Sequence, residues 1–255
     1  MWYNKKMNIG KPYLSIIIPA YNERERIGST LKAVAGFIEK QSYSAEILVV
    51  SDGSTDKTVE IAESARDHIS SLRVIENKEN HGKGWVVRQG MLEAQGGFRL
   101  FTDADNATPI EEFEKLLGWV KPQGIYDIAI GSIGLKESKV DRPEPLPRVI
   151  AGRMANFLIQ TVAVPGIQDT QRGFKLFTAE SAEAIFSKTK IDRWGFDIEV
   201  LALARKLGFT VKEVPIRWIH MAGSKVKADI YYKTLAELAK IRWWLWTNSY
   251  GIRRN

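Results

Sequence analysis

Short apolar runs and helical patterns alternate along the first half of the chain. Residues 13–19 (YLSIIIP) form an apolar run rich in β-branched side chains, which is typical of a strand buried on both faces. From 22 to 38, apolar residues recur every three or four positions and predict a helix, and residues 45–50 (AEILVV) predict a second strand. The chain therefore opens with a β-α-β unit.

The alternation continues, and it predicts an open, mostly parallel sheet. The expected fold class is α/β, with a single sheet flanked by helices. We expect one domain over 1–227, with halves at 13–108 and 109–227, followed by a C-terminal helix within 228–255. Asp197 and Glu199 lie at the start of a predicted helix, where carboxylates favour the helix dipole. The further predicted elements are helices at 58–69, 84–94 and 197–207 and strands at 72–75 and 98–102.

Polar residues follow each predicted strand of the first half. Ligands of parallel sheets bind outside the carboxyl ends of the strands, so these segments are expected to face one crevice. The Gly-x-Gly-x-x-Gly and Walker patterns are both missing, which argues against a dinucleotide or P-loop site. What remains is a nucleotide site built from carboxylates and turns. The segments are PAYNE at 19–23, SDGSTD at 51–56, residues 77–84 with HGKG, and DAD at 103–105.

Asp103 and Asp105 carry the strongest chemical signal. Two carboxylates at a strand end can converge on a hard divalent cation, although aspartates that only cap a turn are the commoner structure. The 51–56 segment has the same ambiguity, because Ser54 or Thr55 can cap the next helix. Lys83 in HGKG lies where a phosphate is expected, but solvated lysines are common in glycine-rich turns.

Composition narrows the class of protein. Cysteine is absent, which excludes disulfides, thiolate metal sites and cysteine nucleophiles and agrees with a reducing compartment. Residues 1–13 lack the apolar core of a signal peptide. No run of about 18 apolar residues occurs, so no membrane-spanning helix is expected. These features predict a soluble or peripheral protein.

The net charge of +7 is concentrated toward the C-terminus. Residues 217–255 hold eight lysines and arginines against two acidic residues. Such an excess suits nucleic acid, an anionic membrane or a phosphorylated substrate.

Residues 228–250 predict a helix with an aromatic, basic end. The WWLW segment at 243–246, with lysine and arginine nearby, has the composition of a helix at a bilayer interface. A helix packed on the domain, or a dimer contact, explains the same residues equally well. Its expected apolar face comprises Tyr231, Leu235, Leu238, Arg242 and Leu245.

Taken together, these motifs resemble those of glycosyltransferase family 2, the inverting nucleotide-sugar enzymes of GT-A fold. PAYNE, SDGSTD, HGKG and TDADNAT occur here in the family's order. In the second half, DTQRGFKLF at 169–177, RWGFDIE at 193–199 and GSKV at 223–226 are similar to the dolichyl-phosphate β-glucosyltransferase branch and, more distantly, to the dolichyl-phosphate mannose synthases. The resemblance implies a nucleotide-sugar first half and an acceptor-binding second half.

The resemblance also implies donor-side roles. Asp105 would be the main protein ligand of Mg²⁺ or Mn²⁺, with Asp103 near the ribose, diphosphate and metal. Lys83 would stabilise the charge on the leaving diphosphate. The mannose synthases have Gln two residues after the second aspartate, whereas this chain has Ala107, so Asn106 or water would supply the third ligand. The residues expected on the base and ribose are Pro19, Tyr21, Glu23 and Asp52.

On the acceptor side, a polyprenyl phosphate is largely ionised near neutral pH and needs cations more than a strong base. Lys225 and Arg148 are the preferred pair, and Asp169 is assigned a catalytic or orienting role by the resemblance. Where the branch commonly has Cys before Gly-Phe-Lys, this chain has Arg172. Trp194 is expected either to form a wall for the sugar or to belong to the core. The acceptor and sugar residues are Arg142, Arg153, Arg172, Lys175, Trp194 and Ser224.

The implied reaction moves glucose from UDP-glucose onto a polyprenyl (dolichyl-type) phosphate, at an anionic membrane on its cytoplasmic face and without nucleic acid. GDP-mannose, UDP-GlcNAc and other acceptors stay open, as do lipid chain length and oligomeric state. One rival is a nucleotidyltransferase, whose glycine-rich, lysine-bearing loop after the first strand is missing here; another is a non-catalytic membrane-surface adaptor. The proline-punctuated loop at 135–147 is expected to be mobile and to order over the acceptor phosphate.

Overall fold

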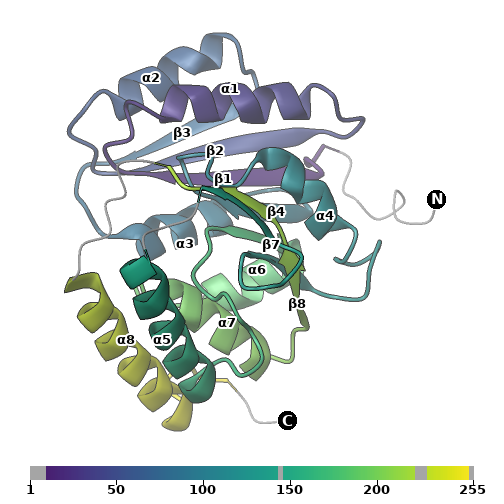
Figure 1. Cartoon of the computed structure of the whole chain (residues 1–255). Helices are drawn as coiled ribbons and strands as arrows, with labels where there is room; N and C mark the ends of the chain where they lie inside the picture. The colour runs from purple at the N-terminus through teal and green to yellow at the C-terminus, as the bar shows by residue number, and fades with distance from the viewer. Residues whose placement is uncertain (1–9, 143–145, 222–228, 253–255) are drawn as a thin grey trace.

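The computed structural model describes residues 10–142, 146–221 and 229–252. Its centre is a seven-stranded sheet in the order β3-β2-β1-β4-β7-β5-β8 (Figure 1). The four strands of the first half are parallel, β5 is parallel to β8, and β7 runs antiparallel to β4 and β5. The strands are β1 (Leu14–Ala20), β2 (Ala45–Asp52), β3 (Leu72–Asn77), β4 (Phe98–Thr102), β5 (Ile128–Ser132), β7 (Phe174–Thr178) and β8 (Val211–Pro215).

The predicted α/β fold with a mostly parallel sheet is confirmed. No strand was predicted after residue 102, so β5, β7 and β8 were missed, and so were two further features of the second half. One is the reversed direction of β7, whose buried residues read like those of a parallel strand, so the pattern of apolar positions does not reveal its direction. The other is a second sheet, in which β6 (Lys139–Arg142) pairs with β9 (Arg217–Ile219). These strands are too short and polar to give a clear alternation.

Helices cover both faces of the sheet (Figure 1). Alternate side chains of β1 enter two apolar clusters, because successive residues of a strand point to opposite faces. Ile16 and Ile18 pack in the cluster that contains Leu31 of α1, and Ile17 packs in the cluster that contains Val87 of α3. The helices are α1 (Ile27–Ile38), α2 (Thr58–Ser64), α3 (Lys83–Glu93), α4 (Phe113–Leu117), α5 (Leu146–Val162), α6 (Ala179–Phe186), α7 (Phe196–Lys206) and α8 (Asp229–Trp246).

Helix α1 begins later than the apolar spacing indicates. The residues before Ile27 form a turn in which Asn22 has a positive φ of 53°. The backbone N–H of Asn22 donates to Ser54 Oγ at 3.1 Å, and its side-chain oxygen accepts from the N–H of Thr55 at 2.8 Å. A helix starting at Asn22 would lose both contacts. The turn therefore joins the segments that follow β1 and β2.

Asp56, and not Ser54 or Thr55 as expected, binds a free N–H at the start of α2. The Asp56 carboxylate accepts from the N–H of Thr58, the first residue of α2, at 2.9 Å. Burial acts to raise the pKa of Asp56, but hydrogen bonds from Thr58 and from the N–H of Arg24 outweigh it and hold the pKa below its ordinary value. Asp56 is therefore a stabilising carboxylate of the SDGSTD segment.

The expected loop at 135–147 is partly ordered structure. Its residues Lys139–Arg142 form β6, and α5 begins at Leu146. Pro147 fits the first turn of α5, because a backbone N–H has no intrahelical partner there. Residues 143–145 lie outside the described part of the chain, so ordering over an acceptor stays a prediction.

Helix α8 packs on the domain beside α5 and α7 (Figure 1). Its buried positions include Thr234, Leu238 and Ile241, whereas Leu235 and Arg242 are exposed. Of the predicted apolar face, Leu238 and Leu245 pack against the core but Leu235 and Arg242 do not, so the prediction is only partly right. Because apolar and aromatic residues occur around most of this helix, their spacing does not select the face that packs. Among the described residues, no helix combines the length and apolar character needed to cross a membrane.

Candidate active site

The segments that follow β1, β2 and β4 meet the start of α3 at one edge of the sheet. The ammonium of Lys83, the first residue of α3, lies 2.6 Å from Asp103 Oδ1. Burial acts to lower the pKa of Lys83, but the charges of Asp103, Asp197 and Asp105 outweigh it and hold the pKa above its ordinary value. Lys83 is thus a permanent cation beside the DAD segment.

Asp103 also contacts the second half of the chain. Its backbone N–H donates to the carbonyl of Gly173 at 3.2 Å. A β-carbon on Gly173 would lie 2.1 Å from Asp103 Oδ2, so a larger residue would displace this carboxylate. The TDADNAT and QRGFK motifs therefore meet at one point, and the glycine is required by their close approach.

Asp105 is the second carboxylate of the pair. It accepts a hydrogen bond from the N–H of Ala107 at 3.0 Å. Burial and then the nearby charge of Asp103 raise the pKa of Asp105, an electrostatic cost that a bound cation would relieve. Carboxylates suit Mg²⁺ and Mn²⁺, and Mg²⁺ is commonly held by one or two of them with phosphate oxygens and water. Asp103 and Asp105 fit such an ion.

No complete protein metal site accompanies this pair. Within the described residues, no group of three or more His, Cys, Asp or Glu side chains gathers that could hold a metal ion. A cation bound to the two aspartates would therefore take its remaining ligands from substrate phosphates and water.

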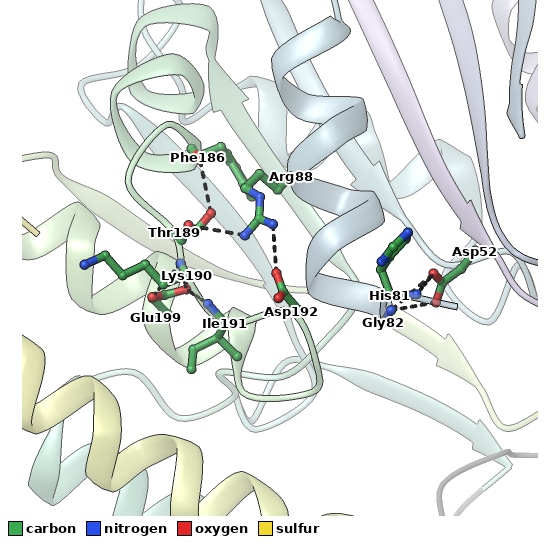
Figure 2. A network of polar contacts seen from close by, with 10 residues as sticks. All are labelled: Asp52, His81, Gly82, Arg88, Phe186, Thr189, Lys190, Ile191, Asp192 and Glu199. Carbon is green, nitrogen blue, oxygen red and sulfur yellow. Dashed lines mark hydrogen bonds and ion pairs between the residues drawn. The ribbon is translucent and has the colours of Figure 1, made fainter. Parts of the chain in front are cut away.

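Asp52 ends β2 and is only 3% exposed. Its oxygens accept from the N–H of His81 at 2.8 Å, from the N–H of Gly82 at 3.0 Å and from Asn80 Nδ2 at 2.9 Å. Figure 2 shows the carboxylate facing the backbone of His81 and Gly82. Asp52 thereby fixes the HGKG turn ahead of Lys83. Its contact with a base stays a prediction.

Lys175 has a different role from the acceptor contact that we expected. It is 1% exposed, and its ammonium lies 2.5 Å from Asp197 Oδ1. Burial raises the pKa of Asp197, although the charges of Lys175 and Lys83 oppose this effect. A cation enclosed in this way is not available to an acceptor phosphate. Lys175 and Asp197 form a buried ion pair beneath Lys83, and Asp197 therefore does more than favour the helix dipole.

Asp169 and Arg172, both predicted to act on the acceptor, form an ion pair. Asp169 Oδ2 accepts from Arg172 Nε at 3.2 Å and from the N–H of Ile133 at 3.1 Å. The guanidinium of Arg172 lies 4.7 Å from the ring centre of Trp218. Since Asp169 is engaged in holding Arg172, the geometry favours the orienting part of its predicted role.

Trp194 is half-buried and borders the site beside Lys83. The Lys83 ammonium lies 5.5 Å from the Trp194 ring centre and 5.4 Å from that of Phe101. Both rings are within the range of a cation–π interaction. The position agrees with a wall of the site, and contact with a sugar stays a prediction.

The other predicted donor residues lie at the end of β1 and just after it. Pro19 is buried in the strand, Tyr21 is exposed, and Glu23 lies 2.6 Å from Arg26 Nε. Their contact with a base stays a prediction. The remaining predicted acceptor residues are Ser224 and Lys225, which lie outside the described residues, and Arg142, Arg148 and Arg153, which are described by their backbone only, in β6 and α5.

Sequence patterns did not indicate the role of the loop at 189–195. In Figure 2, Glu199 faces the backbone of Lys190 and Ile191, and Arg88 reaches Asp192. Glu199 is fully buried, whereas its position in the sequence suggested only an interaction with the helix dipole. The available signal was two carboxylates inside the otherwise apolar segment FDIEVLALA, because a charge is rarely kept there without a specific partner.

Comparisons with known proteins show the family to which the chain belongs. The chain is 42% identical to the dolichyl-phosphate β-glucosyltransferase of Drosophila melanogaster, over 84% of this chain and 69% of that protein. It is 34% identical to the human protein of the same name, over the same shares. The structure also superimposes on glucosyl-3-phosphoglycerate synthase of Mycobacterium tuberculosis, solved with Mn²⁺, UDP and glucosyl-3-phosphoglycerate, with a TM-score of 0.67.

That superposition covers 94% of this chain and 86% of the other at 18% sequence identity, so it establishes the GT-A fold alone. The model of the family described as glycosyl transferase family 2 matches residues 15–186. The matched region contains all four motifs at the strand ends, with Lys83, Asp103 and Asp105 among its residues. The chain therefore belongs to glycosyltransferase family 2.

Proposed function

We propose that this chain transfers glucose from UDP-glucose to a polyprenyl phosphate of the dolichyl type. The observation that carries the proposal is the 42% identity, over most of the chain, to a relative named for this reaction. The cation and paired aspartates at the carboxyl edge of the sheet support it, because a nucleotide-sugar transferase must stabilise a leaving diphosphate.

In this reaction an oxygen of the acceptor phosphate forms a bond to the anomeric carbon of glucose. The bond from that carbon to the UDP oxygen breaks, and its electron pair leaves with UDP. Attack from the opposite face converts an α-linked donor into a β-linked product. Because the second pKa of a phosphate monoester is about 6, the acceptor is already largely a dianion at neutral pH. The protein must supply positive charge and orientation rather than a strong base.

Lys83 is our candidate for the leaving side. Its ion pair with Asp103 holds the ammonium in place before the donor arrives, so little reorganisation is needed during the reaction. Asp105 and Asp103 would hold Mg²⁺ or Mn²⁺, which supplies additional positive charge for the diphosphate. Asp52 acts by fixing the turn from which Lys83 projects, and we retain it with Pro19, Tyr21 and Glu23 as a contact of the base and ribose.

Among the side chains that the structure describes, we assign Arg172 to the acceptor phosphate. Its side chain is partly exposed, and Asp169 and Trp218 hold the guanidinium in one orientation. A held guanidinium presents two donors to a phosphate with little loss of side-chain entropy. We retain Lys225 and Arg148 as further cations on this side, together with Arg142, Arg153 and Ser224, and Trp194 as a wall for the sugar.

The direct test is a panel of radiolabelled UDP-glucose, GDP-mannose and UDP-GlcNAc, each with polyprenyl phosphate and Mg²⁺. We expect label from UDP-glucose to enter the organic phase. Label from another donor alone would refute the assignment of the sugar. Absence of transfer from every donor would refute the proposed function.

Two variants test the donor side. Lys83→Ala and Asp105→Ala are expected to lower transfer by about 100-fold or more. Lys40→Ala and Asp67→Ala, which remove exposed charges, serve as matched controls and should retain wild-type activity. Chelation with EDTA should lower wild-type transfer, and added Mg²⁺ should restore it. Full transfer by Asp105→Ala would refute the mechanism.

We further propose that α8 and α5 face the anionic surface of the membrane that holds the acceptor. Trp243 is 57% and Trp246 69% exposed, and Phe157 of α5 is exposed as well. An open cavity of about 360 Å³ beside Trp246 has three cations and no carboxylate in its lining, which suits lipid phosphates. The lack of cysteine agrees with the cytoplasmic side. The lining residues are Ala202, Arg205, Lys206, Arg242, Leu245 and Trp246.

Flotation with vesicles that contain phosphatidylglycerol tests this surface. Removal of the whole of α8 is unsuitable, because it also removes buried Leu238 and Ile241. The double variant Trp243→Ala with Trp246→Ala should reduce flotation about tenfold. Its transfer to a short, water-soluble polyprenyl phosphate should be unchanged. Equal flotation of wild type and double variant would refute the docking surface, and vesicles of phosphatidylcholine alone provide the neutral control.

A further inference from the structure

The loop at 189–195 lies against the donor turn. A β-carbon on Gly82 would lie 2.4 Å from the carbonyl of Asp192, and one on Gly84 would lie 2.5 Å from the carbonyl of Ile191. The N–H of Trp85 donates to the carbonyl of Asp192 at 3.2 Å. Both glycines of HGKG are therefore packed against this loop, and a movement of the loop would disturb the turn that carries Lys83.

Two carboxylates from other elements hold the backbone of this loop. Glu199 of α7 accepts from the N–H groups of Lys190 and Ile191, both at 2.9 Å (Figure 2). At the other end of the loop, Glu237 of α8 accepts from the N–H of Gly195 at 2.7 Å. A β-carbon on Gly195 would lie 2.8 Å from Glu237 Oε2, so the glycine allows this close contact.

The residues just before Gly195 reach the donor site. Arg193 Nη1 donates to Asn80 Oδ1 at 2.7 Å, and Asn80 Nδ2 donates to Asp52 Oδ2 at 2.9 Å. The ring of Trp194 lies beside the Lys83 ammonium. Contacts thus run without a gap from α8, through the loop, to the residues that we assign to the base and the diphosphate.

We propose that Glu237 is a positioning residue for the nucleotide donor. By holding the N–H of Gly195, its carboxylate sets the placement of Arg193 and Trp194 and thereby the geometry of Asn80 and Lys83. The inference rests on the proposed donor, UDP-glucose. It assigns a role in donor binding to α8, which lies outside the residues matched by the family model.

The test compares Glu237→Ala and Glu237→Gln in the full chain. Glu237→Ala removes the carboxylate that accepts the hydrogen bond from the Gly195 N–H and should leave this N–H unpaired. We therefore expect UDP binding, measured by calorimetry, to weaken about tenfold. The KM for UDP-glucose should rise by a similar factor, with the KM for polyprenyl phosphate unchanged. Glu237→Gln keeps an oxygen acceptor and should restore most of the affinity. Hydrogen exchange at residues 80–83 and 190–195 should accelerate in the alanine variant alone.

Leu238→Ala is the matched control, because Leu238 is buried on the same helix and its side chain cannot accept a hydrogen bond from the loop. It should lower the melting temperature without changing UDP affinity. If wild type and Glu237→Ala bound UDP with equal affinity, the inference would be wrong while the proposed function would stand. The same conclusion would follow if Leu238→Ala weakened UDP binding as much as Glu237→Ala does. Absence of UDP binding to the wild-type protein would overturn the proposed donor together with the inference.

Discussion

At the scale of single residues, the site depends on close approaches that tolerate no added atoms. Gly173 is the sharpest example, since its missing side chain makes room for the Asp103 carboxylate that holds Lys83. A steric requirement of this kind makes a small substitution informative, because its effect on chemistry can be separated from its effect on folding.

Gly173→Ala should therefore damage activity more than stability. The added methyl group would push Asp103 away from Lys83, and we expect transfer to slow by about tenfold or more. Gly36→Ala is the control. Gly36 lies in α1, and a β-carbon added to it would have no atom within 4 Å. This substitution should stabilise the protein by up to about 1 kcal/mol without changing transfer. Unchanged activity of Gly173→Ala would contradict the described contact.

Asp56 gives a pH-dependent prediction for stability. Its folded pKa lies below the ordinary value of 3.8, so the charged carboxylate stabilises the fold above that value, and the contribution is lost as pH falls through the folded pKa. Asp56→Ala should cost about 1 kcal/mol at pH 7, with the deficit shrinking toward pH 3. Urea unfolding followed by circular dichroism measures the loss of stability at pH 7 and at pH 3. A deficit that is the same at the two pH values would show that the charge is not responsible.

At the scale of elements, prediction from the sequence succeeded for the central strands of the first half. A central strand such as β1 is apolar on both faces, and its polar end points to the ligand edge, so both could be read from residues 13–23. The packed face of α8 could not be read in this way, because it depends on the surfaces of α5 and α7. The buried pair of Lys175 with Asp197 was missed for a related reason, since only the fold brings residues 22 positions apart into contact.

The packing of α8 predicts different effects on stability for a buried and an exposed residue of this helix. Ile241 is fully buried under the helix, and Ile241→Ala should lower the free energy of unfolding by about 2–4 kcal/mol. Trp246 projects mostly into solvent, so Trp246→Ala should change the free energy of unfolding by no more than about 0.5 kcal/mol. Thermal unfolding of the two variants measures the difference. A large loss in Trp246→Ala would mean that this ring belongs to the core.

At the scale of the whole molecule, the excess positive charge lies toward the same end of the sequence as the exposed Trp243 and Trp246. Charge and aromatic surface act over different distances, because salt screens charges beyond about 10 Å at 0.1 M and beyond about 3 Å at 1 M. Membrane binding by this end should therefore have a salt-sensitive part and a part that salt does not remove.

We expect flotation with phosphatidylglycerol vesicles to fall steeply between 0.05 M and 0.5 M NaCl, while binding of UDP changes much less. The reason is that the cations beside Trp246 are open to solvent, whereas Lys83 is largely enclosed beside Asp103. Vesicle co-sedimentation and calorimetry over the same salt series provide the comparison. Flotation that does not respond to salt would assign the binding to the tryptophans alone.

The contacts of the loop at 189–195 have a consequence for how the molecule is completed during synthesis. The HGKG turn emerges early, but the carboxylate that holds Gly195 belongs to α8, and the hydroxyl of Tyr250 closes the same cluster by donating to Glu199. A nascent chain that stops before Asp229 has all seven strands of the main sheet and lacks these two supports. The loop packed against Lys83 therefore gains its last supports from the last described segment to leave the ribosome.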